Sequence, residues 1–246
     1  MIHIAEISHT YRSLWRGAAP VQALAALSLE IPAGDAVGLI GVNGAGKTTL
    51  IRTLLGYLRP SAGAATISGL PPRAYAERYG IGYLPERVAI PGGWTVEGAL
   101  QAYALLGNVD EDGPARVEAA LRRLGLEDLR ARKVGTLSKG NLQRLAIAQA
   151  ILGERSVLVL DEPTDGLDPV WIAELREILA DWRAADQARV LIVASHDLPL
   201  IEKVANRAVV LHGGRAIADL DLSSGPPAPS LEHVFLRLVG EQARAA

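Results

Sequence analysis

One stretch of the sequence decides the fold, and it reads Gly41-Val42-Asn43-Gly44-Ala45-Gly46-Lys47-Thr48. It matches the pattern G-x-x-x-x-G-K-[ST], in which glycines let the backbone turn tightly so that successive N–H groups point at phosphate oxygens. A short apolar run, 35–40, precedes the stretch, and helical character follows from residue 47 to about 57. A helix N-terminus adds partial positive charge at the same place. A glycine-rich turn with a chance lysine is the alternative, but the flanking strand and helix favour a phosphate-binding loop.

The residues of this loop have separate predicted roles. Lys47 is expected to reach the β- and γ-phosphates of a nucleoside triphosphate and to take part in its hydrolysis, and the Thr48 hydroxyl is expected to ligate Mg²⁺. The remaining contacts to the nucleotide are assigned to Gly41, Val42, Asn43, Gly44, Ala45, Gly46 and Thr49. By itself the motif identifies only a very broad class, the P-loop nucleoside triphosphatases.

A second motif places two acids after a buried strand, in the run Val157-Leu158-Val159-Leu160-Asp161-Glu162. In a parallel sheet the carboxyl end of a strand is where ligands bind. Asp161 is therefore predicted to contact Mg²⁺, directly or through water. Glu162 is predicted to polarise the attacking water as a general base. Taken alone, a strand followed by an acidic turn would be the commoner interpretation, and the phosphate loop earlier in the chain favours the catalytic one.

The rest of the chain predicts an α/β fold with an inserted helical lobe. Apolar residues recur at three-to-four spacing in 95–106, 114–124 and 141–152, which indicates helices and places the lobe at about 86–152. Strands are expected at 2–7, 24–31, 64–68, 80–84, 156–160, 189–194, 208–211 and 216–220. Because the central strands are continuous apolar runs interleaved with helices, the sheet should be mostly parallel and covered on both faces.

Composition excludes several other classes of protein. With 246 residues and 49% hydrophobic residues, the chain has ample material for a core, and its formal charge of −2 gives no basic field for nucleic acid. The absence of cysteine excludes disulfides, thiolate metal sites and a cysteine nucleophile. No signal peptide or spanning apolar segment is recognisable, so we expect a soluble cytoplasmic protein.

Three further motifs follow the order of a known family. They are Leu137-Ser138-Lys139-Gly140-Asn141-Leu142-Gln143-Arg144, then Asp165-Gly166-Leu167-Asp168, then Ser195-His196-Asp197. Together with the phosphate loop and the acidic pair, they resemble the ATP-binding cassette family, whose signature runs LSGGQ-x-QR. The resemblance covers nearly the whole chain. It implies a P-loop NTPase (RecA-like) core, an N-terminal antiparallel β subdomain and an inserted α-helical subdomain, in a nucleotide-binding domain at 1–222 followed by a linker and C-terminal helix at 223–246.

The resemblance also assigns roles at the subunit interface. Ser138 and Gly140 would face the γ-phosphate of an ATP molecule held by the other subunit, and Asp168 belongs to the loop that crosses the dimer interface. Ser138 is also a good helix N-cap, and that role would by itself explain a serine here.

Two aromatic side chains complete the implied nucleotide site. His196 matches the switch histidine that touches the γ-phosphate, although a histidine taken alone is more often an ordinary loop residue. Tyr11, in the polar segment after the first strand, stands where the family has an aromatic that stacks on adenine. Trp15 is close enough in sequence to compete for that stack.

The sequence departs from the family pattern at three positions. Lys139 replaces the first signature glycine, and we expect its charge to alter the salt dependence of the site. Asn141 replaces the signature glutamine. Glu86 replaces the glutamine of the loop that senses Mg²⁺ and contacts the permease, and its carboxylate is a further candidate metal ligand. Glu86, the LSKG variant with Lys139, and residues 230–236 resemble the type-two exporters, in which single ATPase subunits pair with a separate permease.

The implied function is ATP hydrolysis by a homodimer that closes around two MgATP molecules and drives a membrane permease, with export favoured. The protein would lie at the cytoplasmic side of the membrane, with the helical lobe receiving the permease near 87–94. A soluble ATP-dependent clamp on DNA or the ribosome is an alternative, which the slightly negative charge disfavours. A module that binds ATP without turnover is another, and the intact Lys47, Asp161, Glu162 and His196 argue against it.

Overall fold

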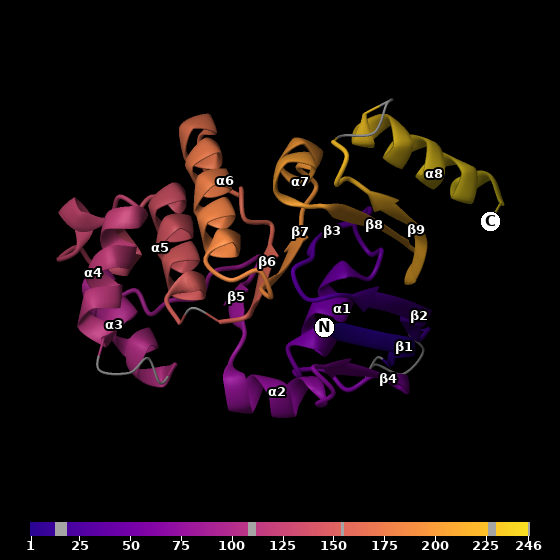
Figure 1. Cartoon of the computed structure of the whole chain (residues 1–246), viewed down its shortest axis with the longest axis horizontal. Helices are drawn as coiled ribbons and strands as arrows, with labels where there is room; N and C mark the ends of the chain where they lie inside the picture. The colour runs from indigo at the N-terminus through magenta and orange to yellow at the C-terminus, as the bar shows by residue number, and fades with distance from the viewer. Residues whose placement is uncertain (13–18, 108–111, 154, 226–229, 246) are drawn as a thin grey trace. The chain divides into compact units, whose positions relative to one another are not determined.

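The computed structural model describes residues 1–12, 19–107, 112–153, 155–225 and 230–245. Contacts between residues divide the chain into two compact units. The first unit combines Met1–Tyr79 with Val190–Ala246, and the second is Gly80–Arg189. Figure 1 shows the elements of both units along the chain.

The first unit opens with an antiparallel sheet in the strand order β2-β1-β4 (Figure 1). Its strands are β1 (Ile2–Tyr11), β2 (Val21–Ile31) and β4 (Ala62–Ile67). Both β1 and β2 are longer than the sequence predicts, because β1 passes through register shifts and continues pairing until Tyr11 meets Val21. Tyr11 therefore ends a strand instead of lying in a polar connection, and Trp15 lies outside the described residues.

A second, mainly parallel group of strands lies in the same unit. In it β3 (Ala36–Ile40) pairs in parallel with β7 (Val190–Ala194) on one side and β8 (Arg207–His212) on the other. Strand β9 (Arg215–Asp221) pairs antiparallel with β8. Every residue of β3 and β7 is buried, as expected for parallel strands that are covered on both faces.

The helices of the first unit begin at clear sequence signals. They are α1 (Lys47–Leu54), α2 (Pro72–Tyr79), α7 (Leu198–Val204) and α8 (Leu231–Ala245). The Asp197 side chain caps α7 by accepting from the Leu200 N–H at 3.0 Å. Helix α8 is the C-terminal helix expected within 223–246, and Glu202 of α7 accepts from its first N–H at 2.8 Å. Residues 226–229 of the predicted linker lie outside the described part of the chain.

The second unit contains a strand pair and a set of helices. Strand β5 (Gly82–Leu84) pairs in parallel with β6 (Val157–Asp161). The helices are α3 (Val96–Leu106), α4 (Gly113–Arg123), α5 (Lys139–Ile151) and α6 (Pro169–Ala184), with short 3-10 turns at Glu127–Leu129 and Val134–Thr136. The three helices predicted for the middle of the chain are therefore present as α3, α4 and α5.

These elements confirm the predicted fold class, an α/β P-loop NTPase fold with mostly parallel central strands, an N-terminal antiparallel sheet and a helical insertion. Among the residues described, none of the helices combines the length and apolar character that crossing a membrane requires.

Candidate functional site

The phosphate loop joins β3 to α1 and leaves the start of the helix open. Gly46 is the N-cap residue, with φ 109, and it has no side chain to cap the helix. The first backbone bond into α1 runs from the Leu50 N–H to the Gly46 carbonyl at 2.9 Å. The N–H groups of Lys47, Thr48 and Thr49 come before this bond and so have no carbonyl of the helix to pair with. An anion is the natural partner for such a helix start.

Two glycines of the loop are required by close packing within the first unit. A Cβ on Gly41 would lie 2.5 Å from the Leu211 carbonyl oxygen, and one on Gly46 would lie 2.6 Å from the Ala23 carbonyl oxygen. Gly44 has φ 81 and open space around its Cβ position. The loop therefore packs closely against neighbouring backbone at Gly41 and Gly46, while space remains open at Gly44. A loop that binds phosphate needs such an open side.

The Lys47 side chain folds back over this loop. Its Nζ donates to the carbonyl of Gly41 at 2.5 Å and more weakly to that of Val42 at 3.4 Å. The ammonium group is thus already placed at the loop, where phosphate oxygens would offer it stronger, charged acceptors. The N–H groups at the start of α1 and the Lys47 ammonium therefore suit the oxygens and the negative charge of a polyphosphate.

Tyr11 lies beside the phosphate-loop helix. Its hydroxyl is 3.5 Å from Thr49 Oγ1, and its ring makes an edge contact with the His9 ring at 4.7 Å between centroids. Tyr11 is 38% exposed as a residue, so it is not sealed within the core. The structure therefore places Tyr11 next to Thr49, and the stacking of its ring on adenine stays a prediction.

His196 lies at the same sheet edge as the phosphate loop. Strand β7 runs parallel to β3, with Ala194 opposite Leu39, so the residues that follow both strands emerge at one edge. His196 is exposed there, between the buried Ser195 and the helix cap Asp197. The first unit thus holds the loop, the tyrosine and the histidine on neighbouring elements.

In the second unit, the two acids stand at the end of β6. Asp161 is 3% exposed, while Glu162 is half-buried and has φ 52. A non-glycine residue in this left-handed region costs on the order of 1–3 kcal/mol and is often found at functional sites. Leu84 pairs with Leu160, so Glu86, which follows β5, emerges at the same edge as Asp161. Their carboxylate oxygens are donors of the kind that Mg²⁺ prefers.

One residue near this edge was not singled out from the sequence. Gln143 is 5% exposed, and its Nε2 donates to the carbonyls of Glu162 and Pro163 at 3.2 and 3.1 Å. Its place in the quoted signature, LSKGNLQR, was the only signal in the sequence.

The signature motif and the following loop form one surface in the second unit. Ser138 caps α5 by accepting from the Asn141 N–H at 3.2 Å, and Asp168 caps α6 by accepting from the N–H groups of Val170 and Trp171 at 2.9 and 3.0 Å. A cavity of about 360 Å³ lies between the two helix starts. Its lining consists of Ser138, Lys139, Gly140, Asn141, Arg144, Gly166, Leu167, Asp168 and Trp171. The three predicted signature-side residues, Ser138, Gly140 and Asp168, therefore line a single cavity.

The two departures in the signature have partners within the chain. The Lys139 ammonium forms an ion pair with Asp165, so in this structure its charge is engaged by a carboxylate. The Asn141 side chain accepts from Arg144, whose guanidinium stacks on the Trp171 ring with 4.0 Å to the centroid. Burial lowers the pKa of Arg144 below its ordinary value, and the Asp168 carboxylate partly opposes that shift.

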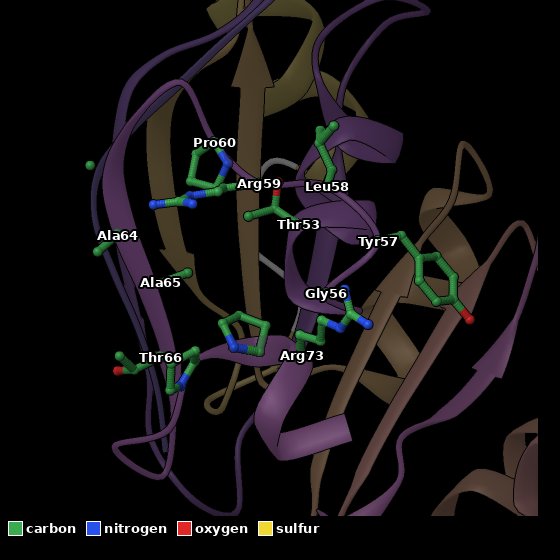
Figure 2. A pocket seen from close by; sticks show the side chains of 13 residues that line it. Thr53, Gly56, Tyr57, Leu58, Arg59, Pro60, Ala64, Ala65, Thr66 and Arg73 are labelled. Carbon is green, nitrogen blue, oxygen red and sulfur yellow. The ribbon is translucent and has the colours of Figure 1, made fainter. Parts of the chain in front are cut away.

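A larger cavity, of about 690 Å³, lies elsewhere in the first unit (Figure 2). It is bounded by the end of α1, by β4 and by the start of α2, and Arg59 and Arg73 are its charged residues. None of the predicted site residues lines it. The nucleotide site is therefore identified by the phosphate loop and not by the size of a cavity.

Together the fold and the loop define a P-loop nucleotide-binding domain, and comparison with known proteins places it more closely. A family model described as ABC transporter matches residues 24–165. A zinc import ATP-binding protein from Paracoccus denitrificans is 35% identical over 212 residues, which are 86% of this chain and 76% of that protein. A Nod factor export ATP-binding protein from Burkholderia lata is 35% identical over 201 residues, 78% of this chain and 64% of the relative.

Solved structures agree with these matches. The ATP-binding subunit of an ABC transporter has a TM-score of 0.83 at 27% identity, covering 97% of this chain and 99% of that one. A dimeric ATP-binding cassette in a post-hydrolysis state with ADP and Pi shares the fold, with a TM-score of 0.82 at 22% identity over 90% of this chain and 99% of that one. The chain belongs to the ABC transporter family, as its motifs predicted. It spans 62% of the length of an uncharacterized ABC transporter ATP-binding protein of Synechocystis and 64% of the Burkholderia protein.

Proposed function

We propose that this chain is the ATP-binding and ATP-hydrolysing subunit of an ABC transporter. The observation that carries the proposal is the open start of α1, where Gly46 provides no side-chain cap and the Lys47 ammonium already lies on the loop carbonyls. A polyphosphate satisfies both features at once, because it supplies acceptors for the helix N–H groups and negative charge for the lysine.

Each site residue then has a chemical task. Lys47 and the loop N–H groups hold the phosphates, and His196 contacts the γ-phosphate. Thr48 and Asp161 would hold Mg²⁺, with Glu86 as a further oxygen donor, and a bound ion would supply positive charge against the phosphate oxygens. Glu162 orients the attacking water and accepts its proton.

The second half of each site comes from another copy of the chain. Ser138, Gly140 and Asp168 line one cavity, and in a sandwich dimer this cavity would face the nucleotide bound to the phosphate loop of the partner. A second copy would thereby supply hydrogen-bond donors from the start of α5. The dimeric state of the solved cassette bound to ADP and Pi is what motivates two copies here.

The membrane partner would be a separate permease, with this chain at the cytoplasmic side of the membrane. Residues 1–222 would form the nucleotide-binding domain and 223–246 a linker and C-terminal helix, while the helical lobe at 86–152 would receive the permease near 87–94. Export is the proposed direction because Glu86, Lys139 and residues 230–236 follow the type-two exporter pattern. The similar proteins include one named for import and one named for export.

The Glu162→Gln variant tests this proposal. We expect it to bind ATP normally and to hydrolyse it at least about a hundredfold more slowly than wild type, because the general base is lost. ATP binding is measured with a fluorescent analogue and turnover by phosphate release. Glu177→Gln, which removes a charge from an exposed site on α6, is the matched control and should behave as wild type.

The same variant identifies the partner. Tagged Glu162→Gln protein in MgATP should stay closed and co-purify, from detergent-solubilised native membranes, with a stoichiometric polytopic membrane protein. Recovery of ribosomes or nucleic acid instead would contradict the transporter role and favour an ATP-dependent clamp. Wild-type turnover by Glu162→Gln would contradict the catalytic assignment itself.

A further inference from the structure

We infer, on the basis of the proposed function, that Gln143 is a positioning residue for hydrolysis, whose side-chain amide holds the turn that presents Glu162. Gln143 does not touch the nucleotide site itself, and it acts through the backbone of the residue that does.

The contacts at Gln143 are specific. Its Nε2 donates two hydrogen bonds, to the Glu162 carbonyl at 3.2 Å and to the Pro163 carbonyl at 3.1 Å. Both carbonyls belong to the turn that follows β6. The Asp165 N–H donates to the same Glu162 carbonyl at 3.2 Å, so the turn is closed from two sides. An amide group with two N–H donors is the side chain that can bridge two adjacent carbonyls in this way.

Burial makes these bonds important for the shape of the turn. Gln143 is 5% exposed and Pro163 is buried, so water has little access to replace a lost bond. Glu162 has φ 52, a conformation that non-glycine residues adopt only when their surroundings impose it. The hydrogen bond from the Gln143 side-chain amide is a contact from another element, α5, to the carbonyl of this residue.

The position of Gln143 on α5 adds a link to the signature motif. Ser138 caps the same helix, and Gln143 follows about one helical turn later. A shift of α5 when its N-terminus engages a nucleotide would therefore move the turn that carries Glu162. Through Gln143, the state of the signature end can set the position of the general base.

The test compares Gln143→Met with wild type. Methionine keeps the length and fills the buried space but cannot donate to the two carbonyls. We expect kcat for ATP hydrolysis to fall by at least about tenfold, while KM and the affinity for an ATP analogue change by less than about threefold, because only the general base is displaced. Ile147→Ala, a core change on the same helix at a side chain that is 1% exposed, is the control for destabilisation of α5. Ile147→Ala should lower the unfolding temperature, but it should not lower kcat selectively while leaving KM unchanged.

A double-mutant cycle separates the positioning role from the proposed function. If Gln143 acts through Glu162, adding Gln143→Met to Glu162→Gln should not lower the residual single-turnover rate further. Should Glu162→Gln alone hydrolyse ATP like wild type, the proposed function is wrong. The positioning role of Gln143 is wrong if Glu162→Gln is inactive while Gln143→Met keeps a wild-type kcat. It is also wrong if the rate loss of the double variant equals the product of the losses of the two single variants. If Gln143→Met does not fold, Gln143→Leu, tested in the same cycle, takes its place.

Discussion

The phosphate loop at 41–49 and the signature surface around the cavity of Ser138 and Asp168 are both proposed to face nucleotide, but they are built differently. The loop is made of backbone: it depends on glycine conformations, on the uncapped start of α1 and on close contacts to the carbonyls of Ala23 and Leu211. The signature surface is made of side chains, which cap helices, form ion pairs and stack. The backbone conformation of the loop requires glycine at particular positions. On the signature surface, by contrast, two interacting side chains can be replaced together by another interacting pair.

The substitutions in this chain follow that difference. The loop matches its pattern at every constrained position, whereas the signature has Lys139 and Asn141 in place of glycine and glutamine. Each of these two residues has a partner in the structure, Asp165 for the lysine and Arg144 for the asparagine. We therefore expect the signature surface to tolerate a substitution when a neighbouring side chain can compensate for it.

The largest effect that this comparison predicts is for Gly46→Ala. The new Cβ would lie 2.6 Å from the Ala23 carbonyl oxygen at a residue with φ 109, so the start of α1 must move. We expect affinity for a fluorescent ATP analogue to fall by more than about a hundredfold, which corresponds to about 2.7 kcal/mol.

Gly44→Ala is the matched control for the loop. Gly44 also has a positive φ, 81, but nothing in the protein lies within 4 Å of its Cβ position, so Gly44→Ala adds a conformational cost of about 1 kcal/mol and no clash within the protein, and its loss of affinity should be the smaller one. Equal losses in the two variants would mean that close packing against β2 does not define the loop.

Much of the fold and of the phosphate loop could be predicted because their signals are local. Continuous apolar runs predict β3, β6 and β7, and apolar residues at three-to-four spacing predict α3 to α5. The glycine pattern of the loop motif is enough to predict a phosphate-binding turn. Tyr11 was misplaced into a connection because the pairing that extends β1 comes from Val21 on another strand. Gln143 was missed for a similar reason, since its partners are backbone carbonyls brought to it by tertiary packing.

A smaller, structural effect is predicted for Arg144→Ala on the signature surface. The guanidinium stacks on Trp171 at 4.0 Å and donates to the carbonyls of Leu124 and Gly125, both at 3.2 Å. Losing the stack and these bonds should lower the free energy of unfolding by about 2 kcal/mol. Urea unfolding monitored by tryptophan fluorescence measures this. Arg144→Lys, which keeps the charge but not the planar fork, should recover only part of the loss, and full recovery would show that charge alone matters there.

The smallest effect concerns Lys139, where charge and packing can be separated. Its ion pair with Asp165 is largely exposed, at 67% and 44% for the two side chains, so it should contribute less than about 1 kcal/mol to stability. Its methylene groups also cover Gly166, since a Cβ built there would lie 2.7 Å from Lys139 Cγ. Lys139→Met keeps the packing and loses the charge, whereas Lys139→Ala loses both.

We expect the difference between wild type and Lys139→Met, in both stability and ATPase rate, to disappear near 1 M salt, where charges are screened beyond about 3 Å. The further deficit of Lys139→Ala should persist there, because packing does not depend on salt. Reversing the pair, with Lys139→Asp and Asp165→Lys together, should restore the low-salt behaviour if side-chain partners can be exchanged on this surface. A reversed pair that behaves no better than Lys139→Asp alone would mean that the signature surface is constrained as strictly as the phosphate loop, which would remove the contrast between the two regions.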